Sequence, residues 1–269
     1  MPELTLTDGA AIWYEETGTG KPLLHLHGSA FGHRNFEKLT PLLSGSFRVI
    51  DFDLPGYGRS HGGPPATDFD GTASQVAELV AALGYERVHV HGTSFGAMIA
   101  LTLAARHPKS VDRLVLSCFL ARYDHAARMM RSTWKRAARD SGMEAVADLT
   151  AVAGFARRFY ETPGAQAQLA SMREAFSHTT VDAFIASTEM IERTDLSPLI
   201  SRVWAPTLLL AGAEDNMTPF RPAASGVGMS RMADSMEWSQ KSVIEESGHY
   251  LVLEQPEQVA ELIIKFLNR

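Results

Sequence analysis

The chain alternates short runs rich in β-branched and aliphatic residues with longer segments of helical spacing. Such runs occur at 23–27, 47–52, 88–91, 114–118, 207–211 and 242–245. The segments between them are long enough to hold crossover helices, which parallel strands require. This rhythm predicts an α/β fold, with helices packed on both faces of a sheet.

Two of the intervening segments have a clear helical period. One places apolar residues at Val76, Leu79, Val80 and Leu83 and stops at Gly84, a residue that commonly ends helices. The other follows Pro256 with Val259, Leu262, Ile263, Phe266 and Leu267. Before the alternation starts, the segments 4–7 and 11–16 flank a turn pair, Asp8-Gly9, which predicts an antiparallel hairpin.

The alternation stops once, between residues 121 and 195, where helical spacing continues without a convincing strand. We predict an inserted helical cap over 121–195, and a core made of 1–120 and 196–269. Bulky apolar residues of this cap are candidates for the walls of a substrate pocket: Met129, Met130, Trp134, Phe155, Phe159 and Phe184. Apolar stripes also arise from packing alone, so each of these residues either lines a pocket or packs inside the cap, and the sequence leaves both roles open.

Basic residues crowd the beginning of the predicted cap, with only Asp124 against them. They are Arg122, Arg128, Arg131, Lys135, Arg136 and Arg139. Such a group either favours an acidic substrate or forms a solvated face, and the sequence leaves both interpretations open.

Composition excludes several classes of protein. The 269 residues are 45% hydrophobic and 21% charged, which is typical of a folded globular protein. A net charge of −6 offers no general cationic field for nucleic acid. No run approaches the roughly 18 apolar residues that span a bilayer, and the N-terminus lacks a basic and apolar leader. With a single cysteine, Cys118, we expect a reducing cytoplasm and no membrane; the oligomeric state stays open.

The strongest chemical signal is Gly92-Thr93-Ser94-Phe95-Gly96, which follows the run at 88–91 and precedes an apolar helical segment. Flanking glycines allow a sharp turn and a close approach of neighbouring backbone. A strand, a tight turn and a helix then meet at one serine, whose hydroxyl is exposed above the sheet. This context makes Ser94 a candidate nucleophile.

A serine hydroxyl needs a base to take its proton and a third group to orient that base. His249 follows the last run in Ser247-Gly248-His249 and is the candidate base. Asp215 lies after the run at 207–211, between Ser94 and His249 in chain order, as this architecture requires. Glu214 and Asp124 are the alternative acids.

The negative oxygen of a tetrahedral intermediate needs hydrogen-bond donors. His27-Gly28-Ser29 ends the run at 23–27, at the same edge of the sheet. We predict that the backbone N–H groups of Ser29 and Phe95 converge there, with Ala30 as an alternative to Ser29. The Ser29 hydroxyl is a third candidate donor.

An alternative role for the histidines of the predicted strands is a metal site. His25, His27, His89 and His91 alternate on strands that would be neighbours, but no carboxylate or cysteine joins them at ligand spacing. We interpret them as hydrogen-bonded structural residues and expect neither a metal nor a cofactor. Cys118 is interpreted as a small buried apolar residue.

The chain resembles the serine members of the α/β-hydrolase superfamily along essentially its whole length. Five motifs match in order: His27-Gly28, the stretch 53–60 (DLPGYGRS), the Ser94 turn, Gly212-x-x-Asp215-x-x-x-Pro219 and Gly248-His249. The resemblance implies an eight-stranded, mostly parallel sheet with a cap inserted after strand six. It also implies a catalytic triad of Ser94, Asp215 and His249.

Within the superfamily the chain is similar to enol-lactone hydrolases, esterases and carbon–carbon bond hydrolases. We therefore predict an esterase or lactonase that forms an acyl-enzyme on Ser94 and acts on a small, largely apolar substrate. Two alternatives are a carbon–carbon bond hydrolase of ring-fission products and a weakly hydrolytic receptor of the same fold. The oxyanion segment, 27–32 (HGSAFG), departs from the sequence that is frequent in carbon–carbon bond hydrolases.

Overall fold

The protein is built around one eight-stranded sheet with the strand order β1-β2-β4-β3-β5-β6-β8-β10. The computed structural model describes residues 2–63 and 67–269. The strands from β4 to β10 in this order run parallel, whereas β1 and β2 are antiparallel, so the predicted mostly parallel sheet and opening hairpin are confirmed. The strands are β1 Glu3–Thr5, β2 Ala11–Thr17, β3 Lys21–Leu26, β4 Phe47–Phe52, β5 Val88–Thr93, β6 Val111–Ser117, β8 Thr207–Gly212 and β10 Ser239–Ile244.

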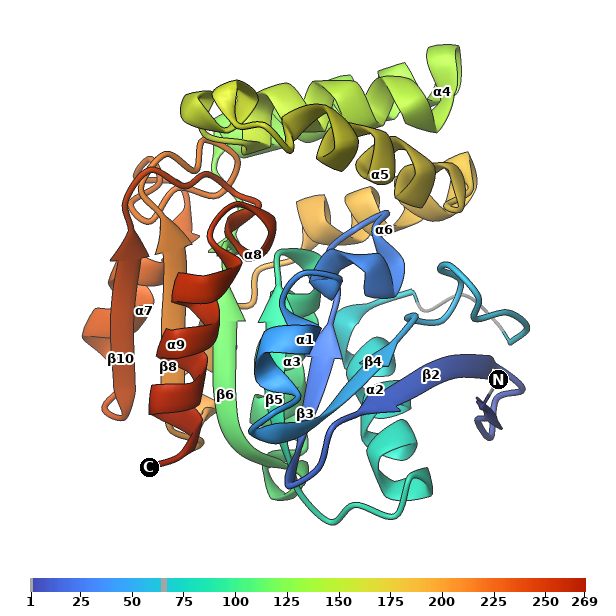
Figure 1. Ribbon diagram of the computed structural model, residues 1–269, viewed down its shortest axis with the longest axis vertical. Helices are drawn as coiled ribbons and strands as arrows, with labels where there is room; N and C mark the ends of the chain where they lie inside the picture. The colour runs from blue at the N-terminus through green and yellow to red at the C-terminus, as the bar shows by residue number, and fades with distance from the viewer. Residues whose placement is uncertain (1, 64–66) are drawn as a thin grey trace.

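Helices cover both faces of the sheet (Figure 1). One face packs against α2 (Phe69–Ala82), α3 (Phe95–Arg106) and α7 (Met229–Ser235), and the other against α1 (Thr40–Leu43) and α9 (Pro256–Leu267). Successive side chains of a strand point to opposite faces. In β3, for example, Leu24 joins the core beneath α2 and α3, while Leu23 joins the core beneath α1 and α9.

The helix boundaries follow from local chemistry. The side chain of Asp68 caps α2 by accepting a hydrogen bond from the Gly71 N–H, and α2 gives way to Gly84 at a φ of +82°. Pro256 occupies the first turn of α9, where its missing N–H costs no helical hydrogen bond. Both helices therefore lie where their apolar spacing predicted them.

Three further helices lie above the carboxyl ends of the parallel strands, across the top of Figure 1. These upper helices are α4 (His125–Gly154), α5 (Ala165–Ser177) and α6 (Val181–Arg193). Gly142 interrupts α4 with a φ of +79°, so α4 consists of two helical parts. The remaining short helices are α8 (Leu251–Glu254), η1 (Gly32–Phe36), η2 (Pro108–Ser110), η3 (Arg157–Glu161) and η4 (Ser197–Arg202).

One strand begins where the sequence pattern indicated none. β7 (Leu120–Arg122) enters the 121–195 segment and pairs antiparallel with β9 (Val227–Gly228), forming a separate two-stranded sheet. A strand of three residues is too short to show a period of two, which is why the alternation did not reveal it.

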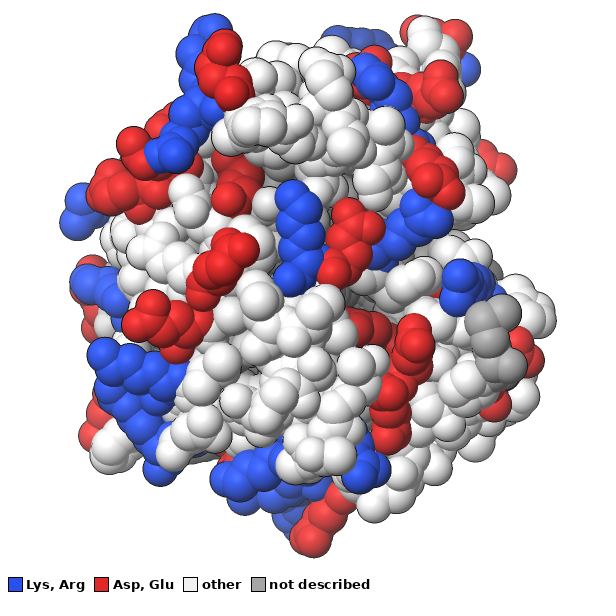
Figure 2. Space-filling model, in the orientation of Figure 1, with Lys and Arg blue, Asp and Glu red and all other residues white. Residues whose placement is uncertain are grey.

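The surface carries both signs of charge. On the face shown in Figure 2, acidic and basic side chains are interspersed rather than separated into fields of one sign. Among the helices of the described residues, we find none with the length and apolar character needed to cross a membrane.

The turn between β5 and α3 brings backbone segments into close contact. The backbone of Ser94 adopts φ +54° and ψ −116°, a conformation that residues other than glycine rarely take. A Cβ at Gly96 would collide with the carbonyl oxygens of Leu26 and His27, and a Cβ at Gly92 would collide with the backbone of Gly96. The two glycines therefore allow β3, β5 and α3 to meet around Ser94.

We expect Gly96→Ala to lower the free energy of unfolding by about 2 kcal/mol or more, because the added methyl group must displace the backbone of β3. Gly45→Ala is the matched control, since its Cβ would meet nothing within 4 Å. The control should change stability by less than about 0.5 kcal/mol. Urea denaturation followed by circular dichroism measures both, and equal stabilities of the two variants would contradict the close-approach argument.

Candidate active site

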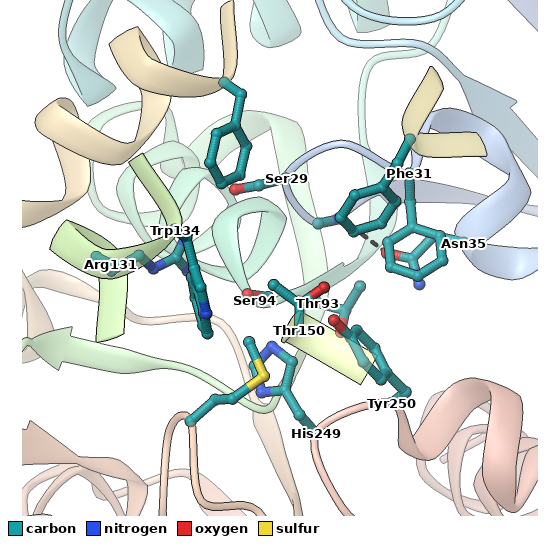
Figure 3. A pocket seen from close by; sticks show the side chains of 14 residues that line it. Ser29, Phe31, Asn35, Thr93, Ser94, Arg131, Trp134, Thr150, His249 and Tyr250 are labelled. Atoms are coloured by element: carbon teal, nitrogen blue, oxygen red, sulfur yellow. Dashed lines mark hydrogen bonds between the residues drawn. The ribbon is translucent and has the colours of Figure 1, made fainter. Parts of the chain in front are cut away.

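Ser94 lies at the amino end of α3, in a pocket beneath the upper helices. The pocket encloses about 410 Å³, its mouth included, and both Ser94 and His249 line it. Figure 3 shows Ser94 and His249 in the central part of the pocket. The structure thus brings together the predicted nucleophile and the predicted base.

His249 is held by a buried carboxylate. Its Nδ1 atom lies 3.0 Å from Oδ2 of Asp215, and Asp215 Oδ1 accepts hydrogen bonds from the N–H groups of Met217 and Thr218. Burial alone would raise the pKa of the Asp215 carboxyl, but the attraction of His249 and these hydrogen bonds outweigh it and lower the pKa below its ordinary value. Asp215 is therefore an ionised partner for a proton on Nδ1 of His249.

Thr218 completes this arrangement and was missed by sequence reasoning. Its hydroxyl donates to Asp215 Oδ2 over 2.6 Å and lies 3.0 Å from Nδ1 of His249. An aspartate side chain in a turn often accepts from the backbone N–H two positions on, as Asp215 does from Met217, and this turn brings Thr218 to the pair.

The two alternative acids have other partners. Glu214 points to the surface, where its carboxylate lies 3.4 Å from the Arg157 N–H. Asp124 caps α4 by accepting from the Ala127 N–H and also accepts from the N–H of Ala223, each over 2.9 Å. Of the three acids, Asp215 is the one bonded to His249.

The segment after β3 supplies donors at the edge of the pocket. The side chain of Asn35 fixes the loop by accepting a hydrogen bond from the Gly28 N–H over 2.7 Å. The Ser29 hydroxyl is buried and has no hydrogen-bond partner among the described residues. At the start of α3, the N–H of Phe95 has no acceptor one helical turn before it. Ser29 lines the same pocket as Ser94, and Phe95 follows Ser94 at the start of α3, while an oxyanion hole formed by their N–H groups stays a prediction.

Of the six cap residues predicted as pocket walls, Trp134 and Phe184 line the pocket. The structure does not bring the other four to it. Met129 is 67% exposed, Met130 packs beside the core, and Phe155 and Phe159 stack on each other with ring centroids 3.8 Å apart. Those two rings support the pocket from behind, since Phe155 packs against Tyr250.

The pocket has further walls that the sequence pattern did not single out. They are Phe31, Asn35, Thr93, Arg131, Thr150, Phe176, Met217 and Tyr250. Figure 3 shows Arg131 and Trp134 on one side and Phe31, Asn35 and Tyr250 on the other. These eight wall residues come from six separate segments of the chain, so no single motif reports them.

A partly buried carboxylate, that of Glu254, links the histidine loop to the segment that follows α4. Glu254 accepts hydrogen bonds from the N–H groups of Gly248 and Ala156, over 2.9 and 2.8 Å, and His249 donates its N–H to the Gly154 carbonyl over 2.6 Å. Burial raises the pKa of Glu254 to about 7; its two hydrogen bonds oppose that rise, and the nearby Asp215 adds to it.

Three of the four strand histidines are hydrogen-bonded as predicted, whereas neither ring nitrogen of His89 has a hydrogen-bond partner among the described residues. His25 bonds to Asp51 over 2.8 Å, and His91 to the Ser117 hydroxyl over 2.9 Å. His27 bonds to the Gly28 carbonyl and to the Leu54 N–H. Within residues 2–63 and 67–269, the group with three metal-ligating atoms close together contains none of these histidines.

That group consists of Cys118, Asp215 and His249, whose candidate ligand atoms lie within 4.8 Å of one another. Asp215 and His249 already bond to each other there. Cys118 is fully buried, as predicted, and burial raises the pKa of its thiol well above the ordinary value. The thiol is therefore held in its neutral form beside the pair.

Comparison with known proteins identifies the family. Residues 21–256 match the family model described as the alpha/beta hydrolase fold. The pimeloyl-[acyl-carrier protein] methyl ester esterase of Chromobacterium violaceum is 31% identical over 216 residues, which cover 77% of this chain and 81% of the esterase. A 2-hydroxy-6-oxononadienedioate/2-hydroxy-6-oxononatrienedioate hydrolase of Pseudomonas putida is 27% identical over 96% of this chain and 91% of its own.

The fold is also that of a solved structure. The thermophilic esterase from Thermogutta terrifontis superposes with a TM-score of 0.86 at 26% identity, covering 100% of this chain and 98% of the esterase. The family match extends from β3 to the first residue of α9 and includes Ser94, Asp215 and His249. The resemblance noted in the motifs is thereby confirmed, and the chain belongs to the alpha/beta hydrolase fold family.

Proposed function

We propose that the protein is a serine hydrolase that cleaves a carboxylic ester or lactone through an acyl-enzyme on Ser94. The single observation that supports this most is the buried Asp215–His249 pair, which faces the same pocket as the strained Ser94. A histidine held by a carboxylate at Nδ1 keeps Nε2 available as a base. This function requires no cofactor.

The reaction proceeds in two halves. The Ser94 oxygen forms a bond to the acyl carbon while His249 takes the serine proton, and the negative oxygen accepts hydrogen bonds from the Ser29 and Phe95 N–H groups. The bond from carbon to the leaving oxygen then breaks, and His249 returns the proton to that oxygen. Water, activated by His249, attacks the acyl carbon and releases the acid and free Ser94.

In this proposal the upper helices act as a cap that shapes the substrate site. Trp134, Arg131 and Phe184 reach the pocket from α4 and α6, while Phe31 and Tyr250 reach it from the core. Aromatic and apolar side chains make up much of these walls, which favours a largely apolar substrate.

Hydrolysis of a carbon–carbon bond is the second candidate. The Pseudomonas putida relative is named as a hydrolase of 2-hydroxy-6-oxo acids, and the motifs of this chain are also similar to those of carbon–carbon bond hydrolases. The same serine, histidine and aspartate would serve it. A panel of 4-nitrophenyl esters, lactones and vinylogous diketones distinguishes the two candidates by which bond is cleaved. A receptor of this fold would turn over none of them at an appreciable rate.

Ser94→Ala should lower kcat by about 10⁴-fold or more, because the three residues act as a unit. It should also abolish covalent labelling by a fluorophosphonate, measured by intact-protein mass spectrometry. The control is Ser74→Ala, on the exposed side of α2, which should keep both activity and labelling. A Ser94→Ala enzyme that keeps a tenth of the wild-type kcat would exclude Ser94 as the nucleophile.

Glu254 should make stability depend on pH. A carboxyl whose pKa is about 7 in the folded state and 4.5 otherwise binds more protons when folded, so the folded state loses stability as pH rises between these values. Relative to Glu254→Gln, the wild type should therefore lose about 1–3 kcal/mol of unfolding free energy from pH 4.5 to 7.5.

Urea denaturation at several pH values measures that difference. Glu257→Gln, at an exposed position of α9, is the matched control and should track the wild type at every pH. A difference between wild type and Glu254→Gln that stays constant with pH would show that Glu254 does not titrate in this range.

A further inference from the structure

The pocket that contains Ser94 also contains a buried cation. Arg131 comes from the first part of α4, lines the pocket, and is only 3% exposed. Charged side chains are almost never buried to this extent unless a partner compensates the lost hydration. The partners of Arg131 therefore decide whether the protein itself meets that need.

The protein meets it only in part. Arg131 Nη2 donates to the Tyr123 hydroxyl over 3.1 Å, and the guanidinium lies over the rings of Tyr123 and Trp134, at 5.4 and 5.2 Å from their centroids. Within the described part of the chain, no carboxylate lies within 4 Å of Arg131. A guanidinium has five N–H donors, so most of its hydrogen-bonding capacity is unused.

The other basic residues at the start of the upper helices differ from Arg131. Lys135 pairs with Glu192 over 2.6 Å, and Arg122 pairs with Asp195 over 3.2 Å. Arg128, Arg136 and Arg139 are exposed to solvent. A solvated or paired face thus accounts for five members of this basic cluster and leaves Arg131 without such an explanation.

The pocket around Arg131 favours an anion. Its lining contains no aspartate or glutamate, so nothing in the wall repels a negative ligand or neutralises the guanidinium directly. The rings of Tyr123 and Trp134 contact the guanidinium, and the Tyr123 hydroxyl accepts from one of its five N–H groups, so further donors are available to a ligand. A carboxylate matches a guanidinium because its two oxygens can accept from two parallel N–H donors.

We propose that Arg131 binds a carboxylate of the substrate, so that the protein hydrolyses an ester or lactone that carries a free acid group. This inference rests on the proposed function and names its substrate class. The acid group belongs either to the acyl part or to the leaving alcohol. In both cases it pairs with Arg131 while the ester carbonyl lies at Ser94.

Matched substrates test the inference. For the acyl side, we compare the 4-nitrophenyl monoester of glutaric acid with the corresponding ester of glutaric acid monoamide. For the alcohol side, we compare 4-carboxyphenyl butanoate with 4-carbamoylphenyl butanoate. Each pair differs only by a carboxylate and an amide of nearly the same shape. The wild type should prefer the acid of one pair by at least about 10-fold in kcat/KM.

Arg131→Met should lower kcat/KM for the preferred acid by about 100-fold, while the matched amide changes by less than about threefold. Arg131→Lys should recover part of the preference, since it keeps the charge but loses the planar fork. Arg128→Met, on the exposed side of α4, is the control and should keep the full preference. Unchanged fluorophosphonate labelling and melting temperature show that the Arg131 variants are folded.

Two results overturn the inference: equal kcat/KM for acid and amide in both pairs, or an equal loss on acid and amide in Arg131→Met. Turnover without preference leaves the serine hydrolase intact, whereas no turnover and no labelling of Ser94 reject the proposed function itself. In that second case, calorimetry with monomethyl glutarate decides. Binding that Arg131→Met weakens about 100-fold supports the carboxylate site, and absence of binding to the wild type rejects it.

Discussion

The close approach of three backbone segments at Ser94 is the constraint on which the rest of the site depends. β3, β5 and α3 meet where only glycine fits at positions 92 and 96, and Ser94 is forced to a φ of +54°. Such a conformation costs about 1–3 kcal/mol and persists only because the buried strands around it fix the backbone. The core therefore maintains the strained backbone at Ser94. This backbone places Ser94 in the pocket at the carboxyl edge of the sheet. His249, Asp215 and the Ser29 loop reach the same edge because they also follow parallel strands.

This dependence explains why so much could be predicted from the sequence. A strained turn needs glycines at fixed positions, and parallel strands buried on both faces need continuous apolar runs, so both requirements are visible as residue types in order. The runs at 47–52 and 88–91 lie within β4 and β5, and Asp215 rather than Glu214 bonds to His249. Each of these predictions concerned neighbours in sequence or strands of one sheet, where geometry follows from the local pattern.

The pocket walls could not be predicted in the same way. Phe155 and Trp134 both belong to apolar stripes of one helical segment, yet Trp134 faces the pocket and Phe155 packs behind Tyr250. Their different positions follow from the path of α4, which Gly142 breaks, and from the way three upper helices pack on the core. Helical periodicity gives the buried side of a helix but not the identity of the surface it meets. For the same reason Arg131 was indistinguishable from the exposed basic residues around it.

The path of α4 also links the two ends of the site. Its first part places Arg131 in the pocket, and its last residue, Gly154, accepts the N–H of His249. Gly248 must lack a side chain for this contact, because a Cβ there would collide with the Gly154 carbonyl. The helix that presents a cation to the pocket thus also holds the loop of the base, with the break at Gly142 between the two contacts. Thr150, in the second part of α4, also lines the pocket, so both parts shape the pocket wall and the second part in addition holds the loop of His249.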